Sequence, residues 1–377
     1  MLYYDFKGKK ISTLGLGCMR FPTVGEDKSV DLEKTAEIID FAMRGGINYY
    51  DTAWGYHLGA SEPIMGQMLA KYPRESFYLT SKFPGYDLSN MTKVEEIFES
   101  QLKRCRVDYF DFYLFHSVTE ENIDEYLNPE NNIYNYLIKQ KKRGRIKHLG
   151  FSTHGTLKTI KRFLDALGEN LEFCQLQVNW LDWTFQHAKE KVELVKSYGL
   201  PVFVMEPVRG GKLCNIPDTC VERLNAAAPE RSLPEWAFRF IQGIDGVAVT
   251  LSGMSSIEQL GENIAVFSEK KPLTSAELDA LNKSAEEMIA SKRLPCTACS
   301  YCTSKCPMGL DIPYLMDLFN ESTSTGLMAA AKQDLACLPK EKHPSACIAC
   351  KACEAVCPQS ISISGMMRKF VTRLERD

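Results

Sequence analysis

Eight of the 14 cysteines fall into two copies of one spacing near the end of the sequence. Each copy reads C-x2-C-x2-C-x3-C and is followed by a proline. The first copy is Cys296, Cys299, Cys302 and Cys306, and the second is Cys347, Cys350, Cys353 and Cys357. This is the bacterial spacing whose thiolates bind cubane iron–sulfur clusters. One copy alone would also fit zinc, but two complete copies with their prolines favour two [4Fe–4S] clusters over zinc or disulfides.

Four ionisable side chains stand at the ends of three successive predicted strands. Asp51 ends one strand and Tyr56 follows it in the next loop, Lys82 ends the next strand, and His116 ends the one after. Each has an ordinary structural explanation: a helix cap, a half-buried aromatic ring, a solvated lysine or a core histidine. In a barrel of parallel strands, however, reactive groups project from the C-terminal strand ends. Together the four side chains therefore predict a catalytic site.

The elements that would position these residues alternate between strand and helix over the first 270 residues. Eight short apolar runs are predicted to be strands: 11–19, 47–53, 77–83, 109–117, 146–154, 173–180, 201–207 and 246–253. Amphipathic stretches such as 32–46, 94–105 and 185–199 are predicted to be helices. Eight such units predict an α/β fold, a (β/α)8 TIM barrel. An open doubly wound sheet is the alternative, but no G-x-G-x-x-G follows the first strand.

The chain after the barrel is predicted to form a small second domain. Residues 275–293 read as one more helix, and 312–324 and 326–335, between the cysteine runs, also look helical. We therefore predict a barrel with a trailing helix over 1–291 and a mainly helical, two-cluster ferredoxin-like domain over 292–377.

Composition restricts the partners and the compartment. The net charge is −3 and no basic block is present, so nucleic acid is excluded as an expected partner. No apolar run suits a signal peptide or a membrane span, so no membrane association is expected. Clusters and unpaired thiols favour a reducing cytoplasm. The cysteines outside the two runs are expected to be small buried apolar residues: Cys18, Cys105, Cys174, Cys214, Cys220 and Cys337.

The C-terminal region resembles a dicluster ferredoxin. In two-cluster ferredoxins the fourth cysteine of each run binds the cluster of the other run. The resemblance therefore implies one cluster on Cys296, Cys299, Cys302 and Cys357. It implies a second cluster on Cys347, Cys350, Cys353 and Cys306.

The barrel segment resembles the aldo-keto reductases over residues 11–268. The matching stretches, in order, are 50–69, 80–84, 114–117, 150–154, 174–179, 205–211 and 252–263. The resemblance implies that Asp51, Tyr56, Lys82 and His116 form a catalytic tetrad that reduces a small-molecule carbonyl. Tyr56 would donate the proton, and Lys82, oriented by Asp51, would lower the pKa of its phenol. His116 would orient the carbonyl oxygen.

The same resemblance implies a nicotinamide dinucleotide site. Its residues are Ser152, Gln175, Met205, Ser252, Gly253, Met254, Gln259, Glu262 and Asn263. Ser152 and Gln175 would hold the carboxamide, and the backbone N–H groups of the turn at 252–254 would bind a phosphate. Glu262 and Asn263 would contact adenine. Trp54 and His154 would line the substrate pocket.

Two departures from the family pattern bear on the dinucleotide. Met205 stands where many members have a tyrosine that stacks on nicotinamide. Gly253 and Gln259 stand where NADPH-specific members have cationic residues, which a 2′-phosphate needs. Only Lys292 and Arg293 offer distant substitutes. NADH is therefore expected to bind at least as well as NADPH.

The two halves of the chain pose an electron-counting problem, because hydride carries two electrons whereas each cubane normally moves one. A flavin could divide the pair, and barrel phosphate sites can hold FMN, but no specific flavin signal is present. Three classes of function stay open. They are an oxidoreductase coupled to the clusters, with an external electron carrier as a candidate partner; a carbonyl reductase with purely structural clusters; and a non-catalytic redox sensor or binding subunit. The intact tetrad argues against the third.

Overall fold

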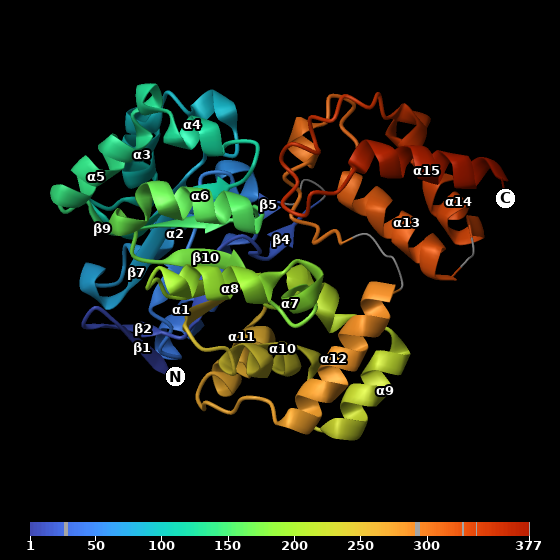
Figure 1. Ribbon diagram of the computed structural model, residues 1–377, viewed down its shortest axis with the longest axis horizontal. Helices are drawn as coiled ribbons and strands as arrows, with labels where there is room; N and C mark the ends of the chain where they lie inside the picture. Colours follow the sequence, from blue (N-terminus) through green and yellow to red (C-terminus); the bar gives the residue numbers. More distant parts are fainter. Residues whose placement is uncertain (26–28, 291–294, 326–327, 337, 377) are drawn as a thin grey trace. The chain divides into compact units, whose positions relative to one another are not determined.

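The first two-thirds of the chain form a closed barrel of eight parallel strands (Figure 1). The computed structural model describes residues 1–377 except 26–28, 291–294, 326–327, 337 and 377. The barrel strands, in the order in which they pair around it, are β3 (Leu14–Gly17), β6 (Tyr49–Asp51), β7 (Tyr78–Phe83), β8 (Phe110–Val118), β9 (Ile146–Thr153), β10 (Cys174–Gln177), β11 (Val202–Met205) and β12 (Val247–Ser252), and β12 pairs with β3. The predicted (β/α)8 barrel is confirmed.

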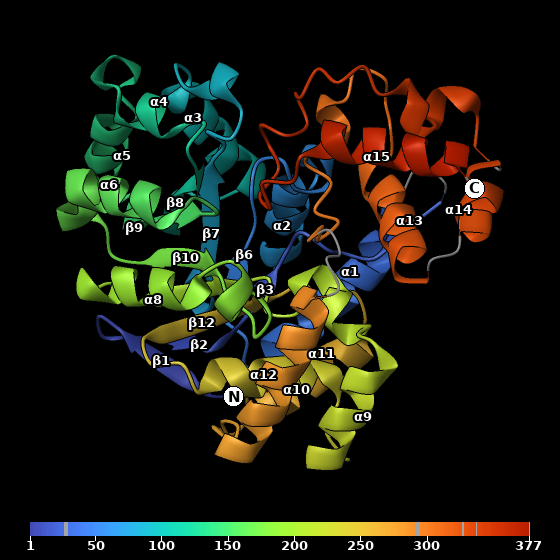
Figure 2. The ribbon, with the colours of Figure 1, turned by 45° about the vertical axis from the view of Figure 1, so that its right-hand side comes forward.

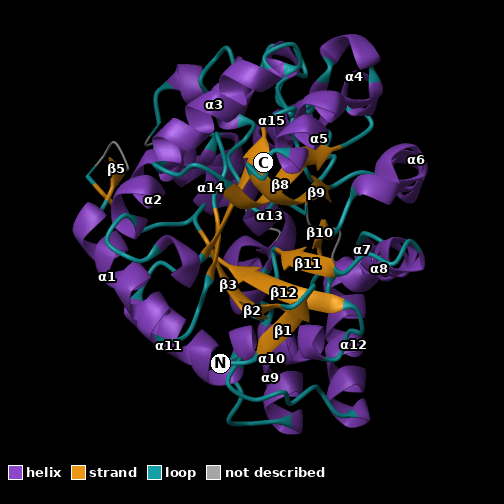
Figure 3. Ribbon diagram, turned by 90° about the vertical axis from the view of Figure 1, so that its left-hand side faces the viewer, coloured by secondary structure: helices purple, strands orange, loops and turns teal. Residues whose placement is uncertain are grey.

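Helices surround the strands, which lie at the centre of the barrel in Figure 3. The helices up to β12 are α1 (Leu32–Arg44), α2 (Ser61–Leu69), α3 (Val94–Cys105), α4 (Ile123–Leu127), α5 (Ile133–Lys142), α6 (Leu157–Leu167), α7 (Asp182–Phe185), α8 (Ala188–Ser197), α9 (Asp218–Ala227) and α10 (Leu233–Gln242). Those after it are α11 (Ile257–Val266), α12 (Ser275–Ala290), α13 (Ile312–Thr325), α14 (Met328–Ala336) and α15 (Ile363–Arg376). The helices predicted at 32–46 and 94–105 are present as α1 and α3. The stretch 185–199 is divided, because Phe185 ends α7 and α8 begins at Ala188.

Aromatic side chains fill the barrel interior. Phe112, Phe173 and Phe203 are fully buried there, and their ring centroids are 4.7–5.7 Å apart. Gly15 on the first barrel strand leaves space for two neighbouring side chains, since a Cβ there would lie 2.8 Å from Leu251 and 3.0 Å from Tyr49. The interior is therefore a packed core, and chemistry is confined to the strand ends.

The N-terminal residues form two antiparallel pairs that the sequence analysis did not anticipate. Strands β1 (Tyr3–Phe6) and β2 (Lys9–Ser12) form one hairpin, and β4 (Thr23–Val24) pairs with β5 (Ser29–Val30). Phe6 contacts the interior rings, with 5.3 Å between its centroid and that of Phe112. The strand predicted at 11–19 was too long at its start, because residues 11–12 end the hairpin and the barrel strand begins at Leu14.

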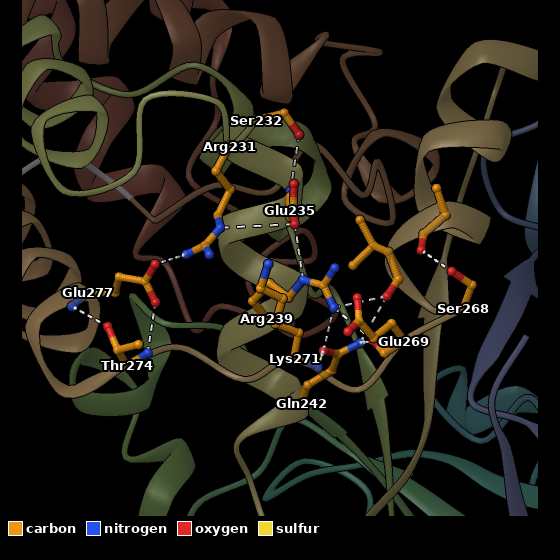
Figure 4. Close-up of polar contacts among 12 residues, drawn as sticks. Arg231, Ser232, Glu235, Arg239, Gln242, Ser268, Glu269, Lys271, Thr274 and Glu277 are labelled. Atoms are coloured by element: carbon orange, nitrogen blue, oxygen red, sulfur yellow. Dashed lines mark hydrogen bonds and ion pairs between the residues drawn. The ribbon is translucent and has the colours of Figure 1, made fainter.

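A buried arginine fixes the helix that leads into β12. Arg239 on α10 is 6% exposed and its guanidinium pairs with Glu235, with 3.0 Å between Nε and Oε1 (Figure 4). It also donates to the carbonyl oxygens of Val266 (3.2 Å) and Glu269 (2.8 Å), at the end of α11. These contacts satisfy carbonyls that the helix end leaves without intrahelical partners. They hold α10 and α11 together beside the last barrel strand.

The chain folds into two compact units. One comprises 1–208 and 227–278, and the other 209–226 and 279–377. In the second unit α13, α14 and α15 pack side by side (Figures 1 and 2) around Leu315, Met316 and Phe370. The unit is mainly helical, as predicted. The domain boundary predicted at 291/292 falls outside the described residues and stays a prediction.

The cysteines outside the two runs are mostly buried. Cys18, Cys105, Cys174 and Cys220 are buried as expected, Cys337 lies outside the described residues, and the prediction is wrong for Cys214, which is exposed. Cys214 ends the short 3₁₀ segment Arg209–Cys214, in which Arg209 and Leu213 are the buried residues. Across the described part of the chain, no helix is long and apolar enough to cross a bilayer.

Candidate active site

Three of the predicted catalytic residues lie in contact at the C-terminal ends of β6 and β7. The Lys82 ammonium donates to Oδ1 of Asp51 at 2.6 Å and to the carbonyl oxygen of Thr52 at 2.8 Å. Its Nζ is 3.5 Å from the hydroxyl of Tyr56. Lys82 is fully buried and Asp51 is 2% exposed. Burial raises the pKa of Asp51, and the charge of Lys82 opposes that rise.

The fourth predicted residue, His116, lies across from Tyr56 at the end of β8. The two rings meet edge to face, with centroids 6.2 Å apart. Burial lowers the pKa of His116 well below its usual value, and the charge of Lys82 acts in the same direction. His116 is therefore neutral, and its Nδ1 has no hydrogen-bond partner among the described residues.

Two tyrosines that the sequence analysis missed support His116. The Tyr86 ring packs edge to face on the imidazole, with centroids 5.1 Å apart. The Tyr126 hydroxyl donates to the backbone oxygen of His116 at 2.8 Å. Neither carries a motif signal, because Tyr86 lies in a turn and Tyr126 on the short helix α4, and only the fold brings them to His116. They hold the end of β8 and enclose the site on that side.

A second buried network lies directly behind Lys82. Glu62 on α2 is fully buried, and its Oε1 accepts from Ser81 (2.6 Å) and from Gln101 (2.7 Å). Gln101 also donates to the backbone oxygen of Lys82 at 3.0 Å. Arg104 pairs with Glu62 at 3.2 Å and stacks on the ring of Trp54, 4.4 Å from its centroid. The network joins the strand that carries Lys82 to Trp54, the predicted pocket residue.

The residues predicted to hold nicotinamide lie on adjacent strands. Ser152 on β9 and Gln175 on β10 pair in register, and Gln175 pairs with Phe203 on β11. Gln175 is 2% exposed; its Nε2 donates to the sulfur of Met205 at 3.7 Å, while its Oε1 has no partner within the described part of the chain. A buried amide oxygen without a partner is costly. The free lone pairs of this oxygen suit a carboxamide N–H donor, the role that the family resemblance implies for Gln175.

The predicted phosphate turn lies between β12 and α11. Ser252 is buried and its hydroxyl accepts from Nδ2 of Asn263 at 3.2 Å, so Asn263 braces the turn. Met254 is also buried, whereas Gly253 is exposed. Gln259 accepts from the N–H of Ser255 at 2.9 Å, which completes the N-terminal cap of α11. Glu262, the other predicted adenine contact, is exposed on the same helix.

One cation beside this turn was missed by the sequence analysis. A Cβ on Gly253 would lie 3.0 Å from Cβ of Arg20, and the Ser255 hydroxyl donates to the backbone oxygen of Arg20 at 2.7 Å. Arg20 follows β3, more than 230 residues earlier in the sequence. The distant candidates Lys292 and Arg293 lie outside the described residues. Arg20 is therefore the basic residue to test for an effect on dinucleotide choice.

The fourth cysteine of the first run lies beside the second run. Cys306 lines the same hollow as Cys347, Cys350 and Cys353. Burial raises the pKa of the Cys302 thiol, and the neighbouring Cys299, Cys296 and Cys357 raise it further. Cys306 thus lies with the second run, as the dicluster resemblance implies, whereas Cys353 also acts on Cys302, and the division into two sets of four stays a prediction. In the residues described, no three Cys, His, Asp or Glu side chains converge on a point suited to a single ion. A cubane holds its ligands farther apart than one ion does.

The backbone of both runs has the same conformation. Ala298 and Ser300 have φ of 54° and 63°, and Ala349 and Lys351, at the corresponding positions, have φ of 56° and 62°. Left-handed residues are uncommon for side chains other than glycine. Alternation between right- and left-handed residues turns successive N–H groups inward, a nest that suits anions such as iron–sulfur clusters. Both loops are therefore built to fit a cluster.

Comparison with known proteins agrees with this geometry. Residues 13–286 match the model of the aldo/keto reductase family, and residues 295–361 match that of a 4Fe-4S dicluster domain. The uncharacterized oxidoreductase YqkF of Bacillus subtilis is 27% identical over 309 residues, which is 74% of this chain and 94% of that protein. The NADH-specific methylglyoxal reductase of Escherichia coli is 27% identical over 223 residues, 54% of this chain and 65% of that protein.

A solved structure extends the likeness to three dimensions. The aldo-keto reductase AKR11C1 from Bacillus halodurans, in its holo form, superposes with a TM-score of 0.62 at 27% identity. The superposed region covers 75% of this chain and 96% of the Bacillus halodurans chain. The barrel, the matched family model and the array of residues at the strand ends agree, and the chain belongs to the aldo/keto reductase family of oxidoreductases, with a 4Fe-4S dicluster domain following the barrel.

Proposed function

We propose that the barrel unit reduces a small-molecule carbonyl, or catalyses the reverse reaction, with Tyr56 as the general acid. The observation that carries this proposal is the buried contact of Lys82 with both Asp51 and the Tyr56 hydroxyl. A cation 3.5 Å from the phenol favours loss of its proton. Asp51 keeps that cation charged and oriented in a site that excludes water.

His116 would be the second hydrogen-bond donor to the carbonyl oxygen. Its neutral ring keeps one N–H group, and a preorganised donor stabilises the negative charge that the oxygen gathers as the carbon is reduced. A bound nicotinamide would supply the hydride. Ser152 and Gln175 would hold its carboxamide, the side chain of Met205 would lie against it, and the turn at 252–254 would bind a phosphate.

NADH is proposed as a dinucleotide that binds at least as tightly as NADPH. Gly253 and Gln259 provide no cation for a 2′-phosphate, and Gln259 is engaged in the cap of α11. The related methylglyoxal reductase of Escherichia coli is named as NADH-specific. Arg20, over Gly253, is the residue that could reverse this preference.

The dicluster domain is proposed to hold one cluster on Cys296, Cys299, Cys302 and Cys357 and another on Cys347, Cys350, Cys353 and Cys306. Exposed Cys350 and Ile348, which is 60% exposed, leave the second set open to solvent. A cluster accessible from solvent suits exchange of electrons with an external carrier, which supports a redox role over a purely structural one. The structural role is the second candidate, because the cysteine loops also line the core around Leu310 and Ile312.

The test of the catalytic proposal is Tyr56→Phe in the full chain with its clusters. This change removes the phenolic proton and keeps the ring. Carbonyl reduction should be lost while NADH still binds with its original affinity, measured by quenching of protein fluorescence. Near-normal turnover in this variant would refute the role of Tyr56. Anaerobic mixing with NADH, with and without added flavin, then shows whether the clusters are reduced.

A further inference from the structure

Four polar side chains joined by hydrogen bonds lie at the C-terminal end of the barrel strands: His154, Gln177, Asp182 and Asn179. Neither the tetrad nor the proposed dinucleotide site uses them. Residues of a strand alternate between its two faces. On β9 the inward set begins with His148, which contacts Phe112 at 5.0 Å, and continues through Gly150 and Ser152. His154 is next in this alternation, one residue beyond the strand. It therefore belongs to the same end of the barrel as Ser152.

On the neighbouring strand the same alternation leads from interior Phe173 through Gln175 to Gln177. The side chain of Gln177 hydrogen-bonds His154, and its Nε2 donates to Oδ2 of Asp182 at 2.7 Å. Asp182, which begins α7, is fully buried. It is a fixed anchor, since a buried carboxylate must keep its hydrogen bonds.

Asn179 completes that anchor. Its Nδ2 donates to the same Oδ2 of Asp182 at 2.7 Å and to the backbone oxygen of Glu206 at 3.1 Å. Its Oδ1 accepts from the backbone N–H of Asp182 at 2.8 Å. Both amides thus converge on one carboxylate, and Gln177 has no freedom to turn away from His154.

His154 is left with one unused hydrogen-bonding atom. Its Nδ1 is buried and has no partner among the described residues. Burial lowers the pKa of His154 to about 4, so the ring is neutral near pH 7. Thr153, the residue before His154, pairs with Val118 on β8, two residues beyond His116, and its hydroxyl donates to the backbone oxygen of Val118 at 2.6 Å, so the two histidines stand at the ends of neighbouring strands. The unused atom therefore belongs to the surroundings of the reacting carbonyl.

Resting on the proposed function, we propose that His154 binds a hydroxyl group of the substrate and that Gln177 and Asp182 are positioning residues that hold its ring. The substrates are then carbonyl compounds with a hydroxyl next to the carbonyl group. A hydroxyl can donate and accept, so it satisfies Nδ1 in either tautomer of the imidazole. A substrate carboxylate in place of this hydroxyl is disfavoured, because only the side chain of Gln177 separates His154 from the buried carboxylate of Asp182.

The experiment compares two aldehydes that differ by this hydroxyl, 2-hydroxypropanal and propanal. It measures kcat/KM with NADH for the full chain with its clusters, corrected for the hydrated fraction of each aldehyde. The wild type should prefer 2-hydroxypropanal by about tenfold, the effect of one hydrogen bond of ordinary strength. His154→Phe should lose that preference. His154→Gln, which can still bond a hydroxyl, should restore part of it.

Because each preference is a ratio within one preparation, partial unfolding of a variant does not change it. His148→Gln, a change on the same strand away from the mouth, is the matched control and should keep the wild-type ratio. Gln177→Leu should raise KM for 2-hydroxypropanal with little change in kcat. Equal kcat/KM of the wild type for both aldehydes, or an unchanged ratio in His154→Phe, overturns the inference and leaves the proposed function standing. Reduction of neither aldehyde overturns both.

Discussion

The buried pair of Lys82 and Asp51 makes a strong prediction about stability. Lys82→Met removes a fully buried cation whose Nζ lies 2.6 Å from the Asp51 carboxylate, and leaves that carboxylate without its charged partner. Removing one member of a buried ion pair typically costs about 3–5 kcal/mol. With a urea dependence of roughly 3 kcal/mol per molar, the unfolding midpoint should fall by about 1 M or more.

The assay can observe the barrel unit alone. All four tryptophans, Trp54, Trp180, Trp183 and Trp236, belong to the unit of residues 1–208 and 227–278. Urea unfolding followed by tryptophan fluorescence under anaerobic conditions therefore reports on the barrel. Asp51→Asn combined with Lys82→Met is the control, because it removes the charge that the single change leaves behind. The double variant should regain a substantial part of the lost stability.

The loss should also depend on pH. Without Lys82, burial raises the pKa of Asp51 further above its unfolded value. An acid with a raised folded pKa binds its proton more tightly in the folded state, so stability decreases as pH rises between the unfolded and folded pKa values. Lys82→Met should therefore be less destabilised at pH 5 than at pH 8. A midpoint within 0.3 M of the wild type at pH 8, on the order of 1 kcal/mol, would refute the reasoning, as would equal losses at both pH values.

Further predictions concern the clusters and the dinucleotide. Protein purified without oxygen should contain about eight irons and eight sulfides per chain, as two cubanes require; stoichiometric zinc with negligible sulfide would contradict this. Cys350→Ser should remove a ligand of the second set only, so about four irons should remain, by metal analysis and by electron paramagnetic resonance of the reduced protein. NADH should bind at least as tightly as NADPH in fluorescence titrations; a tenfold preference for NADPH that Arg20→Gln abolishes would assign the missing cation to Arg20. Lys82→Met should also flatten the pH dependence of turnover above neutrality, and a wild-type pH profile in this variant would exclude Lys82 from that ionisation.

The predictions from sequence succeeded where the chemistry is encoded locally. Cysteine spacing determines how one loop can surround a cluster, so the two runs were identifiable without a fold. The period of the apolar runs gave eight strands, and their ends located Asp51, Lys82 and His116 because parallel strands of a barrel all end on one side. The strand at 11–19 was wrong in its first residues, because a hairpin strand and a barrel strand share the same apolar alternation.

The tertiary structure decided which residues that are distant in the sequence come into contact. Cys306 joins Cys347, Cys350 and Cys353 only because the two loops fold against each other. Arg20 lies over Gly253 because β3 and β12 are neighbours in the closed barrel, although they stand at opposite ends of the barrel sequence.

The buried polar networks are also made of contacts that the sequence does not reveal. Gln101 supports the backbone of Lys82 across 19 residues, and the Gln177 side chain joins His154 to Asp182 across two strands. A glutamine or histidine in a sequence carries no sign of its partner, because hydrogen bonds depend on distances of a few tenths of an ångström that only packing sets. The sequence alone therefore determined which residue types could act, and the closure of the barrel decided which of them meet.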